Sequence, residues 1–331
     1  MCAILDRSMD PGIPTLAAVL DPLELGEHLR QSLPWQGKGL REVEVRLVKH
    51  HAGKRCVLEI TGRTEDGSLS LFGKVYAEDC SDVYRLMEEI GRAGFGPQEE
   101  FSIPQAVTYL PALQLLLQEK VEGRPATESF LSGDEAERAA TAGRCARWLA
   151  RFHAIAPRIG PSFPLSSHLL SIEKWFRRLA TLGEPLADKA RELFKRLGAA
   201  APDPQRIEMR TIHGDYSHHQ VILSPGRTVV VDWDKYRLAD PNQDVARFTV
   251  GLQRLGQRCL GSIRALDAAA EGFLKTYVAS NPSRVTTHLA FQKAATWLEH
   301  AKHDVHKQAP GWRDKAEAAL DEGLRVLEQG V

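Results

Sequence analysis

The prevailing hydrophobic pattern of the chain changes near residue 122, and this change constrains the fold most. Before it, apolar and charged residues alternate, as at Val43, Val45 and Leu47, which is typical of half-buried strands. After the sequence EGRP at 122–125, apolar residues recur every three or four positions, which is typical of amphipathic helices. The pattern predicts an α+β protein with a small sheet-based first part and a larger helical second part.

The first part begins with a predicted helix over Pro22–Leu33, which Asp21 caps and Pro34 ends. An antiparallel meander follows over Val43–Ala77, because turn-forming residues separate its apolar runs. The remaining predicted elements of this part are a helix over Ser81–Ala93 and strands over Ile103–Leu110 and Leu113–Glu119.

The second part is predicted to contain a long helix over Asp134–Ile155 and three short strands. The strands are expected over Arg210–His213, Val221–Leu223 and Thr228–Val231. Further helices are expected over Ser171–Leu182, Ala187–Leu197, Asp244–Leu255, Gly261–Ala279, Arg284–Lys302 and Arg313–Glu328.

Composition excludes several classes of protein. The 43 Lys and Arg residues balance 43 Asp and Glu residues, which argues against a dedicated nucleic-acid binder. Five widely spaced cysteines without a CxxC pair argue against a disulfide framework or a zinc ribbon. No apolar run is long enough to cross a membrane, and the N-terminus does not resemble a secretory signal. We therefore expect a cytoplasmic protein with neither a membrane nor a nucleic acid as its partner.

The segment from 211 to 248 contains most of the candidate catalytic and metal-binding residues. A short apolar strand precedes His213-Gly214-Asp215, and a predicted hairpin turning at Ser224-Pro225-Gly226 then delivers Asp232 at the end of a buried run. Two acidic groups at strand ends suit a Mg²⁺–nucleotide site, because Mg²⁺ prefers carboxylate and phosphate oxygens. One carboxylate could instead accept the proton of an attacking hydroxyl.

These motifs resemble the aminoglycoside phosphotransferase family, whose members are small-molecule kinases with a protein-kinase-like fold. The family pattern is His-Gly-Asp followed by Asn five residues after the Asp, then Asp-(Trp/Phe)-(Asp/Glu), then Asp-Pro-x-x-Asp. This chain has His213-Gly214-Asp215 with Gln220, then Asp232-Trp233-Asp234, then Asp240-Pro241-Asn242-Gln243-Asp244. Gln220 departs from the family pattern, because it stands where the metal-binding Asn is usual.

The resemblance implies a bilobal fold and a set of roles. Residues 1–118 would form the nucleotide-binding lobe, 119–125 the hinge, and 126–331 the helical lobe with the catalytic loop and the acceptor site. Asp215 would be the catalytic base or orient the acceptor hydroxyl, and Asp232, with Gln220, would hold Mg²⁺. The resemblance thus implies transfer of the γ-phosphoryl group of ATP to a hydroxyl of a small molecule.

The same resemblance assigns residues of the first lobe. Lys74, on the third predicted strand, would hold the nucleotide phosphates, whereas a solvent-facing lysine on an edge strand is the alternative. Its acidic partner would come from the following helix, where Asp82 is favoured over Glu88 and Glu89. The basic loop Lys49–Arg55, with Gly53, would cover the phosphates. The Glu119 carbonyl and the Val121 amide of the hinge would bind adenine.

Other interpretations stay open for single residues. Asp240 fits a helix N-cap better than a metal ligand, Asp244 is ambiguous, and His153 is expected to be a packed, hydrogen-bonded histidine. His213, Asp215, His218 and His219 are close in sequence and could suggest a zinc hydrolase, but no further ligands are evident.

The function also has rivals. A nucleotide-binding pseudokinase with a regulatory role is the main alternative, and a protein kinase is disfavoured because its motifs are absent. A sugar, an amino alcohol or an aminoglycoside would fit as acceptor. Glu299 and Asp304, with nearby histidines, do not form the decisively acidic surface that a polycation needs, and a solvated helix face is the alternative for them.

Overall fold

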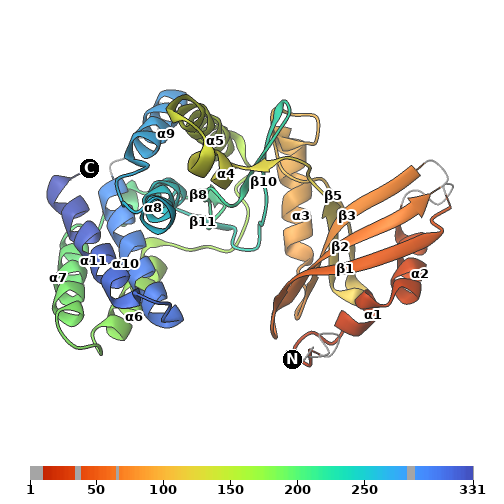
Figure 1. Cartoon of the computed structure of the whole chain (residues 1–331), viewed down its shortest axis with the longest axis horizontal. Coiled ribbons are helices and arrows are strands. Elements are labelled where there is room, and N and C mark those ends of the chain that lie inside the picture. The colour runs from red at the N-terminus through yellow and green to blue at the C-terminus, as the bar shows by residue number, and fades with distance from the viewer. Residues whose placement is uncertain (1–9, 34–38, 65–66, 282–287, 331) are drawn as a thin grey trace. The chain divides into compact units, whose positions relative to one another are not determined.

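A computed structural model describes residues 10–33, 39–64, 67–281 and 288–330. The chain divides into two compact units: the residues up to Gly123 together with Ser224–Val231, and Arg124–Leu223 together with the residues from Asp232 onward. The first is built on an antiparallel sheet and the second is mainly helical, which confirms the predicted α+β class (Figure 1). The segment Ser224–Val231, predicted to lie in the helical lobe, instead groups with the sheet unit because one of its strands pairs there.

The first unit contains a five-stranded antiparallel sheet in the order β1-β2-β3-β6-β5. Its strands are β1 (Glu42–His51), β2 (Arg55–Thr64), β3 (Gly67–Tyr76), β5 (Ala106–Leu110) and β6 (Leu115–Glu119). Its helices are α1 (Leu16–Leu20), α2 (Pro22–Ser32) and α3 (Ser81–Ile90). The short strands β4 (Phe101–Ser102) and β10 (Arg227–Val230) pair in parallel outside this five-stranded sheet.

One face of this sheet packs against α1 and α2. Leu71 and Val75 of β3 belong to the same buried cluster as Leu16 and Leu29 of these helices. Because side chains alternate along a strand, Phe72, Lys74 and Tyr76 face the other side of the sheet. Figure 1 shows α3 on a different side of the sheet from α1 and α2. The predicted Asp21 cap is present, since its carboxylate accepts hydrogen bonds from the first-turn amides of α2.

Several elements of this unit differ from their predicted bounds, and two of these differences have a local structural cause. The loop expected over Lys49–Arg55 shrinks to a turn at residues 52–54, because a bulge after Leu47 lets β1 continue to pair with β2 as far as His51. Helix α3 ends at Ile90 and continues into a wider helical turn over Gly91–Phe95, where Gly94 takes a φ of 100° that ends the regular helix.

The second unit is a set of packed helices with short strand pairs. Its helices are α4 (Ala126–Ser132), α5 (Glu135–Ile155), α6 (Leu165–Leu179), α7 (Leu186–Ala199), α8 (Asn242–Cys259), α9 (Asp267–Ser280), α10 (Leu289–Lys307) and α11 (Trp312–Gln329). Its strands are β7 (Arg124–Pro125), β8 (Arg210–Ile212), β9 (Val221–Ser224) and β11 (Arg237–Ala239), of which β8 pairs with β11 and β7 with β9.

Helix α10 lies at the centre of one hydrophobic core of this unit. It packs against α6, α7, α8 and α11, and Trp297 and Leu298 are fully buried there. The predicted helices are present, with shifted ends. Helix α9 starts at Asp267 rather than Gly261, because Gly261 takes a φ of 74° that a helix does not allow. The predicted start of the next helix, at Arg284, lies outside the described residues.

No helix in the part of the chain that the structure describes is both long and apolar enough to cross a membrane.

Candidate active site

The segment His213-Gly214-Asp215 follows directly after strand β8. Gly214 takes a φ of 77°, in the left-handed region. A Cβ at this position would lie 2.1 Å from the Lys235 carbonyl oxygen. Only glycine fits this turn, and the turn brings the Asp215 side chain out of the buried strand to a partly exposed position.

The backbone of this turn is held by Asp244, in the first turn of α8. Asp244 Oδ2 accepts a hydrogen bond from the His213 amide at 2.7 Å, and Oδ1 accepts one from the Gly214 amide at 2.9 Å. Asp244 is completely buried. A buried carboxylate is unfavourable unless it is well hydrogen-bonded, so these two amides stabilise it while it fixes them.

The protonation state of Asp244 is set by its surroundings. Burial opposes ionisation, but His153, the backbone amide of His213 and nearby charge lower the pKa of Asp244 below its ordinary value. His153 Nε2 lies 3.4 Å from Asp244 Oδ2, and its Nδ1 lies 2.9 Å from the Tyr277 hydroxyl. His153 is therefore a packed histidine that supports Asp244, as expected from the sequence.

The Asp215 side chain lies between two cations. Lys235 Nζ donates to Asp215 Oδ2 at 2.9 Å, and Arg247 Nη1 lies 3.5 Å from Oδ1. Arg247 in turn pairs with Glu299 of α10 at 2.7 Å. Burial opposes ionisation of Glu299, yet Arg247 lowers the pKa of its carboxyl to about 2. The Asp215 carboxylate is thus oriented by a chain of ion pairs that reaches α10.

Aromatic packing anchors the rest of the motif to α5. The Trp233 ring is fully buried, 4.7 Å from the His213 ring and 5.2 Å from the Phe152 ring between centroids. The Tyr216 hydroxyl donates to the Cys145 carbonyl oxygen at 2.8 Å. Residues next to Asp215 and Asp232 are therefore fixed to one long helix.

The residues expected to hold a metal are brought together. Gln220 Nε2 lies 3.5 Å from Asp232 Oδ2. Asp232 takes a φ of 69°, which is uncommon for a residue other than glycine and costs on the order of 1 kcal/mol. Mg²⁺ commonly uses one or two protein oxygens together with phosphate oxygens, so this pair fits it if the Gln220 amide turns its oxygen toward the ion.

The zinc alternative does not fit. The described residues contain no cluster of three or more His, Cys, Asp or Glu side chains that could hold a metal ion. His213 packs against Trp233, and His218 Nδ1 lies 2.8 Å from the Thr127 hydroxyl. The histidines near Asp215 therefore have structural partners instead of a common ligand.

In the first unit, Lys74 occupies the strand β3, with β2 on one side and β6 on the other. It is only 6% exposed. The alternative of a solvent-facing edge-strand lysine is therefore wrong. Asp82 is exposed in the first turn of α3, whereas Glu88 and Glu89 both pair with Arg92.

The turn predicted to cover phosphates has a partner of its own. The Gly53 amide donates to Asp10 Oδ2 at 2.8 Å, and His50 Nε2 lies 2.7 Å from the same oxygen. The hydrogen bond from Gly53 is the main cause of the lowered pKa of Asp10. The Gly53 amide thus already binds an anionic oxygen, which belongs to the chain itself.

The predicted hinge residues follow the end of β6. The Glu119 carboxylate accepts from Arg227 Nη1 at 2.9 Å and from the Gln105 amide at 3.0 Å, and the Glu119 amide donates to the Gln105 carbonyl. Val121 is 9% exposed. The backbone at the end of this strand is therefore well fixed.

Sequence reasoning left Asp244 ambiguous and missed Arg247 and Lys235. The spacing of Asp244 and Arg247, three residues apart on one predicted helix, places them on one face and could have indicated a joint role. Lys235 carries no comparable signal, because its contact with Asp215 depends on the fold of the intervening hairpin. Asp240 is not the N-cap of α8, a position that Pro241 occupies, but its carboxylate accepts hydrogen bonds from the Asn242 amide and from Gln292 Nε2.

The chain is similar to known proteins in its sequence and in its fold. Residues 61–277 match the model of the phosphotransferase enzyme family. No curated protein sequence matches the chain. Among solved structures, a choline/ethanolamine kinase family protein from Mesorhizobium loti is similar, with 15% identity, a TM-score of 0.58, and coverage of 92% of this chain and 94% of that one.

Two further solved structures share the fold. Choline kinase from Cryptosporidium parvum has 10% identity and a TM-score of 0.62, with 92% of this chain and 95% of that chain covered. The GDP complex of aminoglycoside 2'-phosphotransferase-IIIa has 16% identity and a TM-score of 0.57, with 94% and 98% covered. At these identities the likeness concerns the fold.

Proposed function

Because this chain belongs to the phosphotransferase enzyme family, we propose that it transfers the γ-phosphoryl group of ATP to a hydroxyl of a small molecule. The observation that carries the proposal is the arrangement of Asp215. Its backbone turn is held by a buried carboxylate, its side chain is oriented by Lys235 and Arg247, and it lines a cavity of about 400 Å³. This cavity has the size of a small-molecule site.

In this reaction the acceptor hydroxyl attacks the γ-phosphorus. The bond from the acceptor oxygen to phosphorus forms, the bond from phosphorus to the β–γ bridging oxygen breaks, and ADP leaves. Asp215 orients the hydroxyl and accepts its proton at a carboxylate oxygen. The protein contributes mainly by positioning, so the rigidity of the Gly214 turn is central to the rate.

The remaining residues have proposed binding roles. Asp232 and Gln220 would hold Mg²⁺, which when bound neutralises phosphate charge. Lys74 would contact the nucleotide phosphates, with Asp82 as its acidic partner. The Glu119 carbonyl and the Val121 amide would bind the adenine ring.

Gly53 would cover the phosphates through its backbone amide. The hydrogen bond from this amide to Asp10 supports its affinity for anionic oxygen. A phosphate at the same position would have to replace the Asp10 carboxylate.

The test is ADP release from Mg·ATP in the presence of a pooled panel of hydroxyl compounds. We expect acceptor-stimulated release in the wild type and a loss of about 10²- to 10⁴-fold in Asp215→Asn. Asp314→Asn, a change at an exposed aspartate of α11, is the matched control and should keep full activity. Nucleotide binding without turnover under any condition would refute the proposal and favour a nucleotide-binding regulator.

A further inference from the structure

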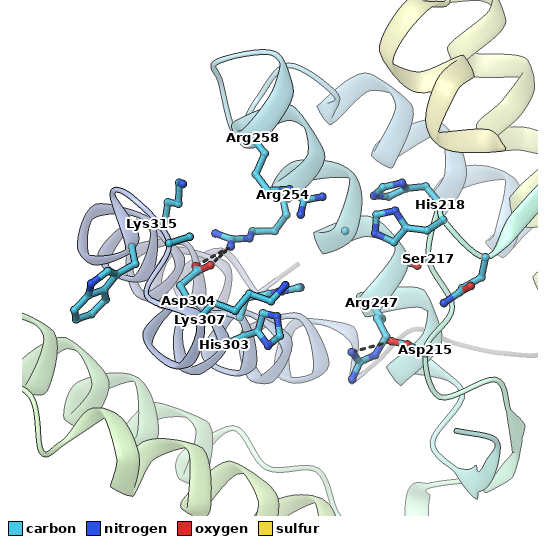
Figure 2. A pocket seen from close by; sticks show the side chains of 16 residues that line it. Asp215, Ser217, His218, Arg247, Arg254, Arg258, His303, Asp304, Lys307 and Lys315 are labelled. Carbon is cyan, nitrogen blue, oxygen red and sulfur yellow. Dashed lines mark hydrogen bonds and ion pairs between the residues drawn. The ribbon is translucent and has the colours of Figure 1, made fainter. Parts of the chain in front are cut away.

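The cavity beside Asp215 lies wholly within the second unit. The loop after Asp215, helices α8 and α10, and the start of α11 form its wall. Figure 2 shows Asp215 and Ser217 on one side of it, with Asp304 and Lys307 on the other. A ligand bound in this cavity can therefore reach the Asp215 carboxylate, which is proposed to accept the proton of the acceptor hydroxyl.

Helix α8 contributes a column of arginines to the wall. Arg247, Arg254 and Arg258 are separated by seven and then four residues, so they lie on one helical face. Arg247 is paired with Asp215 and Glu299, and Arg254 Nη2 lies 2.6 and 2.7 Å from the two oxygens of Asp304. The charges of these two arginines are thus largely matched.

Three further cations of the wall are not matched in this way. Arg258, Lys307 and Lys315 form no ion pair within the described part of the chain, and Lys315 donates only to the Pro310 carbonyl oxygen, at 2.9 Å. The acidic side chains of the wall are Asp215 and Asp304, and both are already paired. The cavity therefore has a net positive charge, although the whole chain is neutral.

His300, a histidine of the wall, does not change this balance at neutral pH. Burial is the main cause that lowers the pKa of His300 to about 3, and the neighbouring Arg254 adds to it. The His300 ring is neutral at pH 7 and can serve as a hydrogen-bond partner. The fixed charge of the cavity comes from its arginines and lysines.

We propose that the acceptor is an anionic alcohol, whose phosphate or carboxylate group binds Arg258, Lys307 and Lys315 while its hydroxyl faces Asp215. The inference rests on the proposed function and names its substrate class. Unpaired cations on the walls of a recess attract an oxyanion and repel a polyamine. Arginine and lysine donors also form charge-assisted hydrogen bonds with phosphate or carboxylate oxygens. This pocket thus disfavours choline-like and aminoglycoside-like acceptors.

The first test measures binding, independently of turnover. Inorganic phosphate and malonate, as phosphate and carboxylate probes, are titrated calorimetrically into the ADP-saturated protein. We expect Lys307→Gln and Arg258→Gln each to weaken binding of the preferred probe about tenfold, the loss of one charge-assisted contact. Lys275→Gln removes an exposed lysine of α9 outside the cavity and should have no effect. Equal affinity in all variants, or no binding of either probe at millimolar concentration, would overturn the inference.

The second test compares four acceptors on one carbon skeleton: glycerol, glycerol 3-phosphate, glycerate and 3-amino-1,2-propanediol. We expect the phosphate or the carboxylate compound to have the highest kcat/KM, and Lys307→Gln to raise its KM while leaving kcat nearly unchanged. The phosphate and carboxylate arms identify which anion is recognised. A preference for glycerol or for the amine would overturn the inference and leave the phosphotransferase function intact.

Failure of the two proposals can be told apart. Absence of turnover with every acceptor, together with anion binding that depends on Lys307 and Arg258, would count against the proposed function and support an anionic ligand in this cavity. Turnover combined with anion binding that ignores these two residues would count against the anionic acceptor alone.

Discussion

Asp244 shows how one side chain can fix the geometry of a loop that is distant in the sequence. Its two carboxylate oxygens accept hydrogen bonds from the consecutive amides of His213 and Gly214, so Asp244 fixes the turn that carries Asp215. It is a positioning residue. Its influence on a reaction should therefore appear in the turnover rate more than in substrate affinity.

We predict that Asp244→Asn lowers both stability and turnover. An amide has one oxygen, so one of the two backbone donors would face an NH₂ group and lose its partner, at about 2 kcal/mol of unfolding free energy. The kcat should fall at least tenfold with a smaller change in nucleotide KM. Urea unfolding and steady-state kinetics measure these effects.

The pH dependence of this effect has a fixed sign. Because the folded pKa of Asp244 is lowered, its ionised form stabilises the protein above the ordinary carboxyl pKa of 3.8, and this stabilisation is lost as the pH falls through the folded value. The loss of unfolding free energy caused by Asp244→Asn should thus become smaller below about pH 4. Asp188→Asn, at an exposed ion pair, is the control and should cost less than about 0.5 kcal/mol.

Lys74 allows a second prediction at the level of one residue. Its side chain is buried in an internal strand, and Lys74→Met keeps the stem while removing the charge. If it holds phosphates, nucleotide affinity should fall about tenfold or more, since a charge-assisted contact is lost. Titration with a fluorescent nucleotide measures this. Lys195→Met, at an exposed position of α7, should bind nucleotide normally, and equal affinity in both variants would contradict the role of Lys74.

Among the secondary-structure elements, the turn after β8 is the most constrained. Gly214→Ala should disable it, because a Cβ would meet the Lys235 carbonyl carbon and oxygen in addition to carrying a positive φ. Gly226→Ala is a close control, since Gly226 has a φ of 72° but no atom within 4 Å of the new Cβ. We expect a loss of about 1 kcal/mol for Gly226→Ala from backbone strain alone, and a clearly larger loss of stability and of kcat for Gly214→Ala. Equal losses in the two variants would mean that the close approach of the Lys235 carbonyl group to Gly214 is unimportant.

Most elements follow from the sequence because their signals are local. Alternation in β2 and β3, the Asp21 cap of α2 and the apolar spacing of α5 are all readable from a few neighbouring residues. The bulge that lengthens β1 and the two-residue strand β4 are not readable in this way. Their existence depends on pairing partners that are distant in the chain.

The same distinction applies to the site. Asp215, Asp232 and Gln220 were found from motif spacing, and the structure brings the latter two within 3.5 Å. The contacts of Asp215 with Lys235 and Arg247 were not found, since they depend on how a hairpin and a helix meet. A solvated helix face is one sequence-based interpretation of Glu299 and Asp304, whereas in the structure each is paired with an arginine of α8.

For the molecule as a whole, buried histidines make stability dependent on pH. Burial lowers the pKa of His168 to about 4 and that of His218 to about 2, from an ordinary value of 6.5. At pH values between 6.5 and the lowered pKa of each histidine, the unfolded chain binds more protons than the folded chain. The unfolding free energy therefore falls as the pH falls below 6.5. The maximum slope is about 1.4 kcal/mol per pH unit for each histidine.

We therefore expect the unfolding free energy to be lower at pH 5.5 than at pH 7.5 by roughly 1.4 kcal/mol for each of these histidines. Urea unfolding at the two pH values measures the difference. His168→Phe keeps the aromatic packing with Phe291 and Trp175 while removing one titrating group, so the difference should shrink. His306→Gln, at an exposed position, should leave it unchanged. If His168→Phe showed the same difference in unfolding free energy as the wild type, the pH dependence could not be assigned to His168.

The arginine column of α8 has a consequence for how such a protein can evolve. Asp244 lies in the first turn of this helix, whereas Arg247, Arg254 and Arg258 follow it on one face. Deleting one residue between Asp244 and Arg247 would leave the carboxylate in place and rotate every later side chain by about 100°. A single codon lost or gained there would replace the charged lining of the cavity in one step, whereas point substitutions would need to change each arginine in turn.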